Sequence, residues 1–72
     1  MTADEQLASL AAEIDAIAER LSDRSLELLR SAVADPENRA AASTEKLVTR
    51  ARRSLEKAAA LLRTSGERTE SL

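Results

Sequence analysis

The chain has 72 residues and a formal net charge of −2, and it contains no cysteine, histidine, phenylalanine, tyrosine or tryptophan. The lack of cysteine and histidine excludes disulfides, thiolate nucleophiles, imidazole bases and the usual zinc ligands. A chain of this length forms one domain at most. Its core is small, because much of its apolar content is alanine, which buries little area.

The first residues, MTADEQ, are acidic, whereas a secretory signal begins with basic residues. The sequence also has no run of 18 apolar residues, the length that a helix needs to span a bilayer. We therefore expect a cytoplasmic, soluble protein with no membrane span.

Charge is distributed unevenly along the chain. Residues 1–38 hold nine acidic against three basic residues, a net charge of −6, and residues 39–72 hold eight basic against four acidic residues, a net charge of +4. This asymmetry indicates that the two halves pair, within a chain or between chains, or that the second half binds an anionic partner.

The first half has the pattern of one long helix. Thr2 and Glu5 form a capping box, which places the start of the helix at Ala3. Five large apolar residues then follow at steps of three and four, and the pattern slips at Ser25 in a stutter. The sequence predicts a helix over about residues 3–34 with an apolar stripe that consists of Leu7, Leu10, Ile14, Ile17 and Leu21.

The single proline marks the turn. Pro36 disfavours a helical conformation for Asp35, and the same proline suits the first position of a new helix. We expect a tight turn at residue 35, a second helix over about 36–65 and a frayed tail at 67–72 after a stop at Gly66. A start of the second helix near Thr44 is the alternative. The predicted stripe of the second helix is Ala41, Thr44, Val48, Ala51, Leu55, Ala58 and Leu62.

Folding the chain at this turn brings the two stripes into register, with residue 7 opposite 62, 14 opposite 55 and 21 opposite 48. The predicted fold is an all-α antiparallel two-helix hairpin over residues 1–66. A single seam between two helices buries little apolar area for a stable fold, and several large apolar residues lie outside this seam. These off-seam residues are Leu26, Leu29, Val33, Leu47 and Leu61.

The most economical cover for the off-seam residues is a second copy of the hairpin, which gives a homodimeric four-helix bundle. A marginal monomer, a larger oligomer and a complex with another helical protein are the alternatives. We expect a non-enzymatic interaction or scaffold module without metal or cofactor. Its predicted interface is Leu7, Leu10, Ile14, Ile17, Leu21, Leu26, Leu29, Val33, Leu47, Val48, Leu55, Leu61 and Leu62.

Four cations share one face of the second helix, at steps of four, three and four: Lys46, Arg50, Arg53 and Lys57. They indicate an alternative function, the binding of nucleic acid or another anionic surface. The absence of aromatic residues for base stacking disfavours nucleic acid, as do Glu45 and Glu56, which interrupt the patch.

Acidic residues form a matching run on the outward part of the first helix, namely Asp15, Glu19, Asp23 and Glu27. Carboxylates act in catalysis when a pocket shifts their pKa values, and an outward helix face offers no such pocket. We therefore predict no catalytic or metal site.

Two hydroxyl residues, Ser25 and Thr44, fall where the predicted seam is otherwise apolar. One interpretation is a small polar layer that fixes the register of the helices. The other is a hydrogen bond from each hydroxyl to a carbonyl one turn earlier in its own helix.

The segment LASLAAEIDAIAERL, residues 7–21, resembles the first helix of the all-helical chorismate mutases at Ile14 and Asp15. Ala11 stands where the resemblance places an active-site arginine of that family. The cation that would hold a substrate carboxylate is therefore missing, and we assign the chain to no family on this ground.

Overall fold

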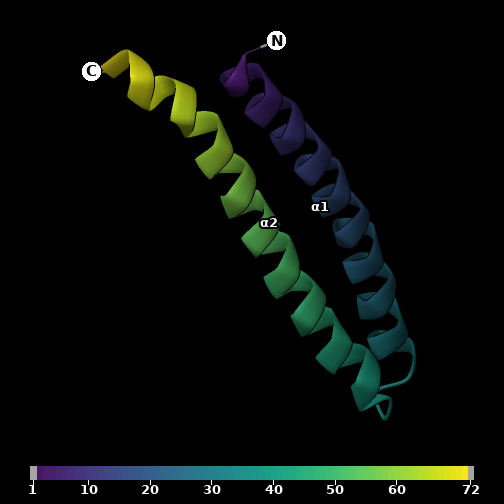
Figure 1. The fold of residues 1–72 in the computed structure, drawn as a ribbon. Helices are drawn as coiled ribbons and strands as arrows, with labels where there is room; N and C mark the ends of the chain where they lie inside the picture. Colours follow the sequence, from purple (N-terminus) through teal and green to yellow (C-terminus); the bar gives the residue numbers. More distant parts are fainter. Residues whose placement is uncertain (1, 72) are drawn as a thin grey trace.

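A computed structural model shows an antiparallel hairpin of two long helices, which confirms the predicted fold class (Figure 1). It describes the backbone of residues 2–71 and the side chains of residues 2–64. Helix α1 spans Ala3–Ala34 and helix α2 spans Arg39–Ser71. The molecule measures 55 × 20 × 12 Å, so it is a rod two helices wide and one helix thick. No helix in the described part has an apolar stretch that could cross a membrane.

Helix α1 begins and ends where local chemistry requires. The Glu5 amide donates a hydrogen bond of 3.2 Å to the hydroxyl of Thr2, which is the N-cap. Asp4 and Glu5 in the first turn place negative charge at the positive end of the helix dipole. At the other end, Asp35 leaves the helical conformation, with φ −137° and ψ 87°, because the following Pro36 disfavours a helical Asp35, and the helix stops there.

The turn occupies residues 35–38 and is longer than predicted. The Asn38 amide donates to the Asp35 carbonyl at 2.9 Å, and the Ala41 amide donates to Asn38 Oδ1 at 3.3 Å. Asn38 is therefore the cap of α2, with the hydrogen bond that an N-cap makes to the third helical residue. As a result, α2 begins at Arg39, three residues after the predicted start at Pro36 and before the alternative near Thr44.

Helix α2 also ends later than predicted. It continues through Gly66 to Ser71, so residues 67–71, for which a frayed tail was expected, are helical in the structure. Glycine permits a left-handed stop without imposing one, and its cost inside a helix is only about 1 kcal/mol. Leu72 lies outside the described residues.

The seam between the helices follows an unbroken alternation of steps of four and three. Every residue of the seam is buried or half-buried. This alternation is the heptad spacing of a coiled coil, and it continues through Ser25 without the predicted stutter. We define the seam as Leu7, Ala11, Ile14, Ala18, Leu21, Ser25, Leu28 and Ala32 on α1, with Ala41, Glu45, Val48, Arg52, Leu55, Ala59 and Leu62 on α2.

The residues of the observed seam differ in part from those of the two predicted apolar stripes. Leu10 and Ile17 on α1 are about half exposed, and Thr44 and Ala51 on α2 are exposed. In their place, alanines occupy the centre: Ala11, Ala18, Ala41 and Ala59 are the buried residues of the described chain. Small side chains at these positions let the two backbones approach closely.

The longer turn also shifts the register by about one helical turn. Because both helices rise equally from a turn centred between Pro36 and Glu37, residue 18 lies opposite 55 and residue 11 opposite 62. Small residues on one helix are thus set against leucines on the other. The predicted register assumed a turn centred near Ala34 and Asp35. It set large apolar residues opposite one another at 7 and 62, 14 and 55, and 21 and 48, and it set Leu10 and Ile17 opposite Ala58 and Ala51.

Candidate interaction surface

The hairpin has two long sides, and one of them is rich in apolar residues. On α1, Leu10 and Ile17 each precede a seam alanine, and on α2, Leu47 and Leu61 each precede a large apolar seam residue. Since the helices are antiparallel, residues that precede seam positions on both helices lie on the same side of the hairpin. We call this the apolar side; these four side chains are between 46% and 63% exposed.

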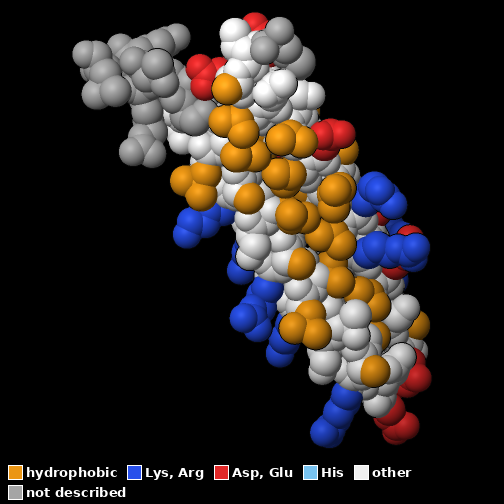
Figure 2. Space-filling view, viewed as in Figure 1, with side chains coloured by type: hydrophobic (Ala, Val, Ile, Leu, Met, Phe, Trp, Pro, Cys, Tyr) orange, Lys and Arg blue, Asp and Glu red, His pale blue; other side chains and the backbone are white. Residues whose placement is uncertain are grey.

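On α2, the flank that contributes to the apolar side carries no charge. The residues that precede its seam positions are Ala40, Thr44, Leu47, Ala51, Ser54, Ala58 and Leu61. Apolar side chains gather along the line where α1 and α2 meet, and cations lie along the outer edge of α2 (Figure 2). An apolar band with a charged rim is the usual anatomy of a protein–protein interface.

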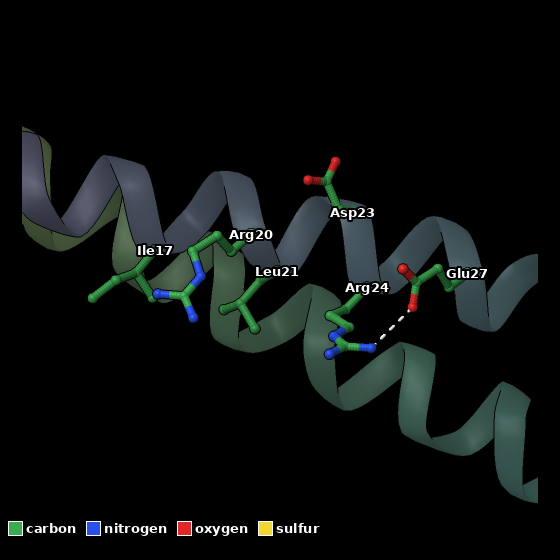
Figure 3. A pocket seen from close by; sticks show the side chains of 6 residues that line it. All are labelled: Ile17, Arg20, Leu21, Asp23, Arg24 and Glu27. Carbon is green, nitrogen blue, oxygen red and sulfur yellow. Dashed lines mark hydrogen bonds and ion pairs between the residues drawn. The ribbon is translucent and has the colours of Figure 1, made fainter.

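On α1, the apolar side passes into a charged region. Ile17, Leu21, Arg20 and Arg24 point to the same side of the helix, and Asp23 points away (Figure 3). These residues line a shallow, open concavity together with Glu27, which pairs with Arg24 at 3.0 Å. Arg20 makes no ion pair within the described residues.

The other long side, which we call the polar side, is formed by residues that follow seam positions. An ion pair of 2.6 Å between Arg63 Nη2 and Asp15 Oδ2 joins the two helices here. Asp15, Ser22 and Glu56 line a second shallow concavity on this side. The carboxylate of Glu56 pairs with Arg52 at 2.8 Å, so it already has a partner one helical turn away.

The predicted off-seam residues are divided between the two sides. Leu47 and Leu61 belong to the apolar side, whereas Leu26, Leu29 and Val33 each follow a seam position and lie on the polar side near the turn. All five are exposed. The remaining predicted interface residues, Leu7, Ile14, Leu21, Val48, Leu55 and Leu62, are half-buried in the seam.

A polar layer interrupts the seam at Ser25, with partners that differ from the predicted one. The Ser25 hydroxyl donates to Glu45 Oε1 at 2.7 Å, and the Thr49 hydroxyl donates to the same oxygen at 2.6 Å. These hydrogen bonds, first from Thr49 and then from Ser25, lower the pKa of the Glu45 carboxyl, and the charges of Arg52 and Arg53 act in the same direction. Thr44 is exposed, because the register places Glu45 in the seam.

Three of the four predicted anion-binding residues meet at one place. Lys46, Arg50 and Arg53 line a shallow concavity with Glu45 and Thr49. Lys57 is exposed one helical turn further along α2, outside that concavity. The side chain of Glu45 therefore brings negative charge to the rim of the basic cluster.

Sequence reasoning missed Glu45, Thr49 and Arg52 as seam or near-seam residues. A signal was present, because the alternation from Ala41 through Val48 and Leu55 to Leu62 places residues 45, 52 and 59 in the heptad.

Comparison of the chain with models of protein families, with curated proteins and with solved structures finds no match. The geometry of the hairpin is therefore the basis for any functional proposal.

Proposed function

We propose that the protein is a small non-enzymatic interaction module that self-associates through its apolar side into a four-helix bundle of two chains. One observation carries the proposal: Leu10, Ile17, Leu47 and Leu61 are exposed together on one side of the hairpin. Exposed apolar patches on a small helical domain favour burial against another molecule.

Energetics support this proposal, because the hairpin alone leaves much apolar area in water. Only alanines are buried among the described residues, and the larger seam residues are half-buried. Complete burial of a leucine or isoleucine contributes about 1.5–3 kcal/mol. Covering four such residues on each of two chains would add a substantial part of the stability that a thin seam lacks.

We also propose a cytoplasmic location, and composition supports both this and the non-enzymatic role. The chain has neither histidine nor cysteine, the residues most used as general bases and thiol nucleophiles. The same lack of cysteine is typical of proteins that do not depend on an oxidising compartment.

The test is solution mass by light scattering, with helicity measured by circular dichroism. We expect a mass near twice 7.8 kDa for the native chain. Ile17→Glu should reduce the mass to that of one chain with most of the helicity retained, since residue 17 lies outside the seam.

The matched control is Leu29→Glu, which places the same charge on the polar side. We expect this variant to keep the dimeric mass. A native mass of 7.8 kDa would contradict the proposal. Dissociation by Leu29→Glu but not by Ile17→Glu would move the interface to the patch near the turn.

The basic concavity on α2 supports a second candidate function, the binding of an anionic surface such as nucleic acid. The supporting observation is that Lys46, Arg50 and Arg53 line one concavity. Fluorescence anisotropy with a labelled oligonucleotide should then show steeply salt-dependent binding. Replacing these three residues and Lys57 with glutamine should abolish it, and unchanged affinity in that variant would contradict this function.

A further inference from the structure

We propose that the two hairpins pair with their turns at the same end, so that α1 of each chain packs against α2 of its partner. This inference rests on the self-association proposed above and adds the orientation of the partner. A hairpin dimer with two-fold symmetry has two simple arrangements. The axis runs along the bundle and joins unlike helices, or it crosses the bundle and joins like helices with the turns at opposite ends.

The charges of the helices favour the pairing of unlike helices. Helix α1 carries seven acidic and three basic residues, a net charge of −4. Residues 39–64 of α2 carry seven basic and two acidic residues, a net charge of +5. Packing α1 against the partner's α2 brings opposite charges together, whereas the other arrangement packs like against like.

Positions along the rod agree with this arrangement. A two-fold axis parallel to the helices brings together residues at equal distance from the turn. We call the distance from the turn, measured along the helix axis, the height of a residue. The heights of Leu10 and Leu61 differ by about two residues, which is about 3 Å at 1.5 Å per residue. These two exposed leucines would therefore cover one another between chains, twice in each dimer.

Two glutamates on α1 beside the apolar side come near the heights of two cations on the outer edge of α2. Glu13 on α1 lies within about three residues of the height of Lys57 on α2, and Glu27 within about four residues of the height of Arg50, which is about 6 Å or less. Arg20 comes level with the neutral Ser54, three to four residues from Arg50 and Lys57, and Arg24, which pairs with Glu27, comes level with Arg50. These cations offset part of the match, so the net charges of the two helices carry the argument.

The opposite arrangement is less favourable for the same residues. If like helices were joined so that Leu47 met Leu61 of the other chain, Arg50 would approach Lys57 on the facing α2. On the facing α1, Arg20 would approach its own copy, and Arg24 would approach Glu13. The encounters of Arg50 with Lys57 and of Arg20 with its copy place cations together, and only that of Arg24 with Glu13 joins opposite charges.

Distance measurement between the turns tests the orientation. The chain has no cysteine, so Glu37→Cys, in the exposed turn, provides one site for a nitroxide label. Pulsed electron paramagnetic resonance on the labelled full chain should give a distance below about 30 Å if the turns lie at the same end. Turns at opposite ends of a rod of this length would be about 50 Å apart.

A distance near 50 Å would overturn the orientation and leave self-association intact. A mass near that of one chain, 7.8 kDa, for both the labelled variant and the native chain would instead overturn self-association, and the orientation with it. Light scattering on the same sample separates these two failures.

Charge exchange is the second test and uses no label. Glu13→Lys alone and Lys57→Glu alone each place like charges at the proposed contact, so each should weaken dimerisation several-fold at low salt. A mixture of the two variants should restore it, because each mixed dimer regains two contacts of opposite charge. As a matched control, Glu19→Lys, whose site follows a seam alanine on the polar side, should leave the mass unchanged alone and in a mixture. Failure of the mixture to restore association would overturn the proposed contact.

Discussion

The two long sides of the hairpin are built from the same two helices but differ in the interactions they offer. The polar side joins α1 to α2 through the pair of Asp15 with Arg63 and carries the pair of Glu56 with Arg52. Its exposed apolar residues, Leu26, Leu29 and Val33, lie near the turn. The apolar side exposes Leu10, Ile17, Leu47 and Leu61 and has an uncharged flank along α2.

This difference separates the interactions that orient the helices from those that favour a partner. Directional contacts between exposed charges contribute little free energy, with typical values up to about 1 kcal/mol per pair. Apolar area contributes in proportion to its burial, and a single hairpin leaves that area in water. The seam of small residues between the two sides holds both in place, so its disruption should have the largest effect.

The first prediction disrupts that seam. Ala18 is 5% exposed, and Ala18→Asp would place a charge with no partner between the helices. We expect destabilisation of about 3 kcal/mol or more. Because the apolar and polar sides both depend on the seam, helicity and association should be lost together. Circular dichroism and light scattering on the same samples measure the two losses.

Ala16→Asp is the matched control, since it introduces the same residue into the same helix at an exposed position. It should cost only the difference in helix propensity, a few tenths of a kcal/mol up to about 0.7. Equal destabilisation by the two variants would contradict the close approach of the helices at Ala18.

The fold was predictable because its signals are local. Thr2 and Glu5 mark the start of α1, Pro36 marks its end, and the long periodic segments on either side leave few alternatives to a hairpin. The cap of α2 was not recognised, because Asn38 stands beside a proline that can itself start a helix. That difference of three residues is enough to shift the register by about a turn.

The division of residues between seam and surface was less predictable, because alanine gives no strong signal. Steps of three and four from Leu7 fit Leu10 and Ile17 as well as they fit Ala11 and Ala18. Large residues are the natural choice for a core, but a pair of helices gains contact along its whole length when small residues let the backbones approach. Glu45 and Arg52 further obscured the α2 seam, since charged residues are rarely chosen as core.

The second prediction concerns the polar layer, which joins the seam to the polar side. The pKa of Glu45 is lowered in the folded chain, so its carboxylate contributes stability that is present above the unfolded pKa, about 4.3. That contribution is lost as the pH falls through the lower folded pKa. Thermal unfolding followed from pH 6 to pH 3 should therefore show a drop in melting temperature across the acid end of this range.

Glu45→Gln isolates the contribution of this residue, because glutamine keeps the shape and an acceptor for Ser25 and Thr49 but does not titrate. Other carboxylates titrate in the same range, so the informative quantity is the difference in melting temperature between the variant and the native chain. This difference should be larger at pH 6 than at pH 3. A difference that does not change with pH would contradict the stabilising role of the charged form.

The third and smallest effect is expected from the ion pair on the polar side. Asp15 and Arg63 are each nearly half exposed, so Arg63→Gln should cost at most about 1 kcal/mol, a few degrees in melting temperature. Salt of about 1 M should reduce the difference, because the Debye length is then about 3 Å, comparable to the 2.6 Å between the paired atoms. Arg30→Gln, which removes a cation that makes no ion pair within the described residues, controls for the change in net charge.

Because the pair lies opposite the apolar side, Arg63→Gln should leave the dimeric mass unchanged; a loss of association would show that the polar side takes part in the contact between chains.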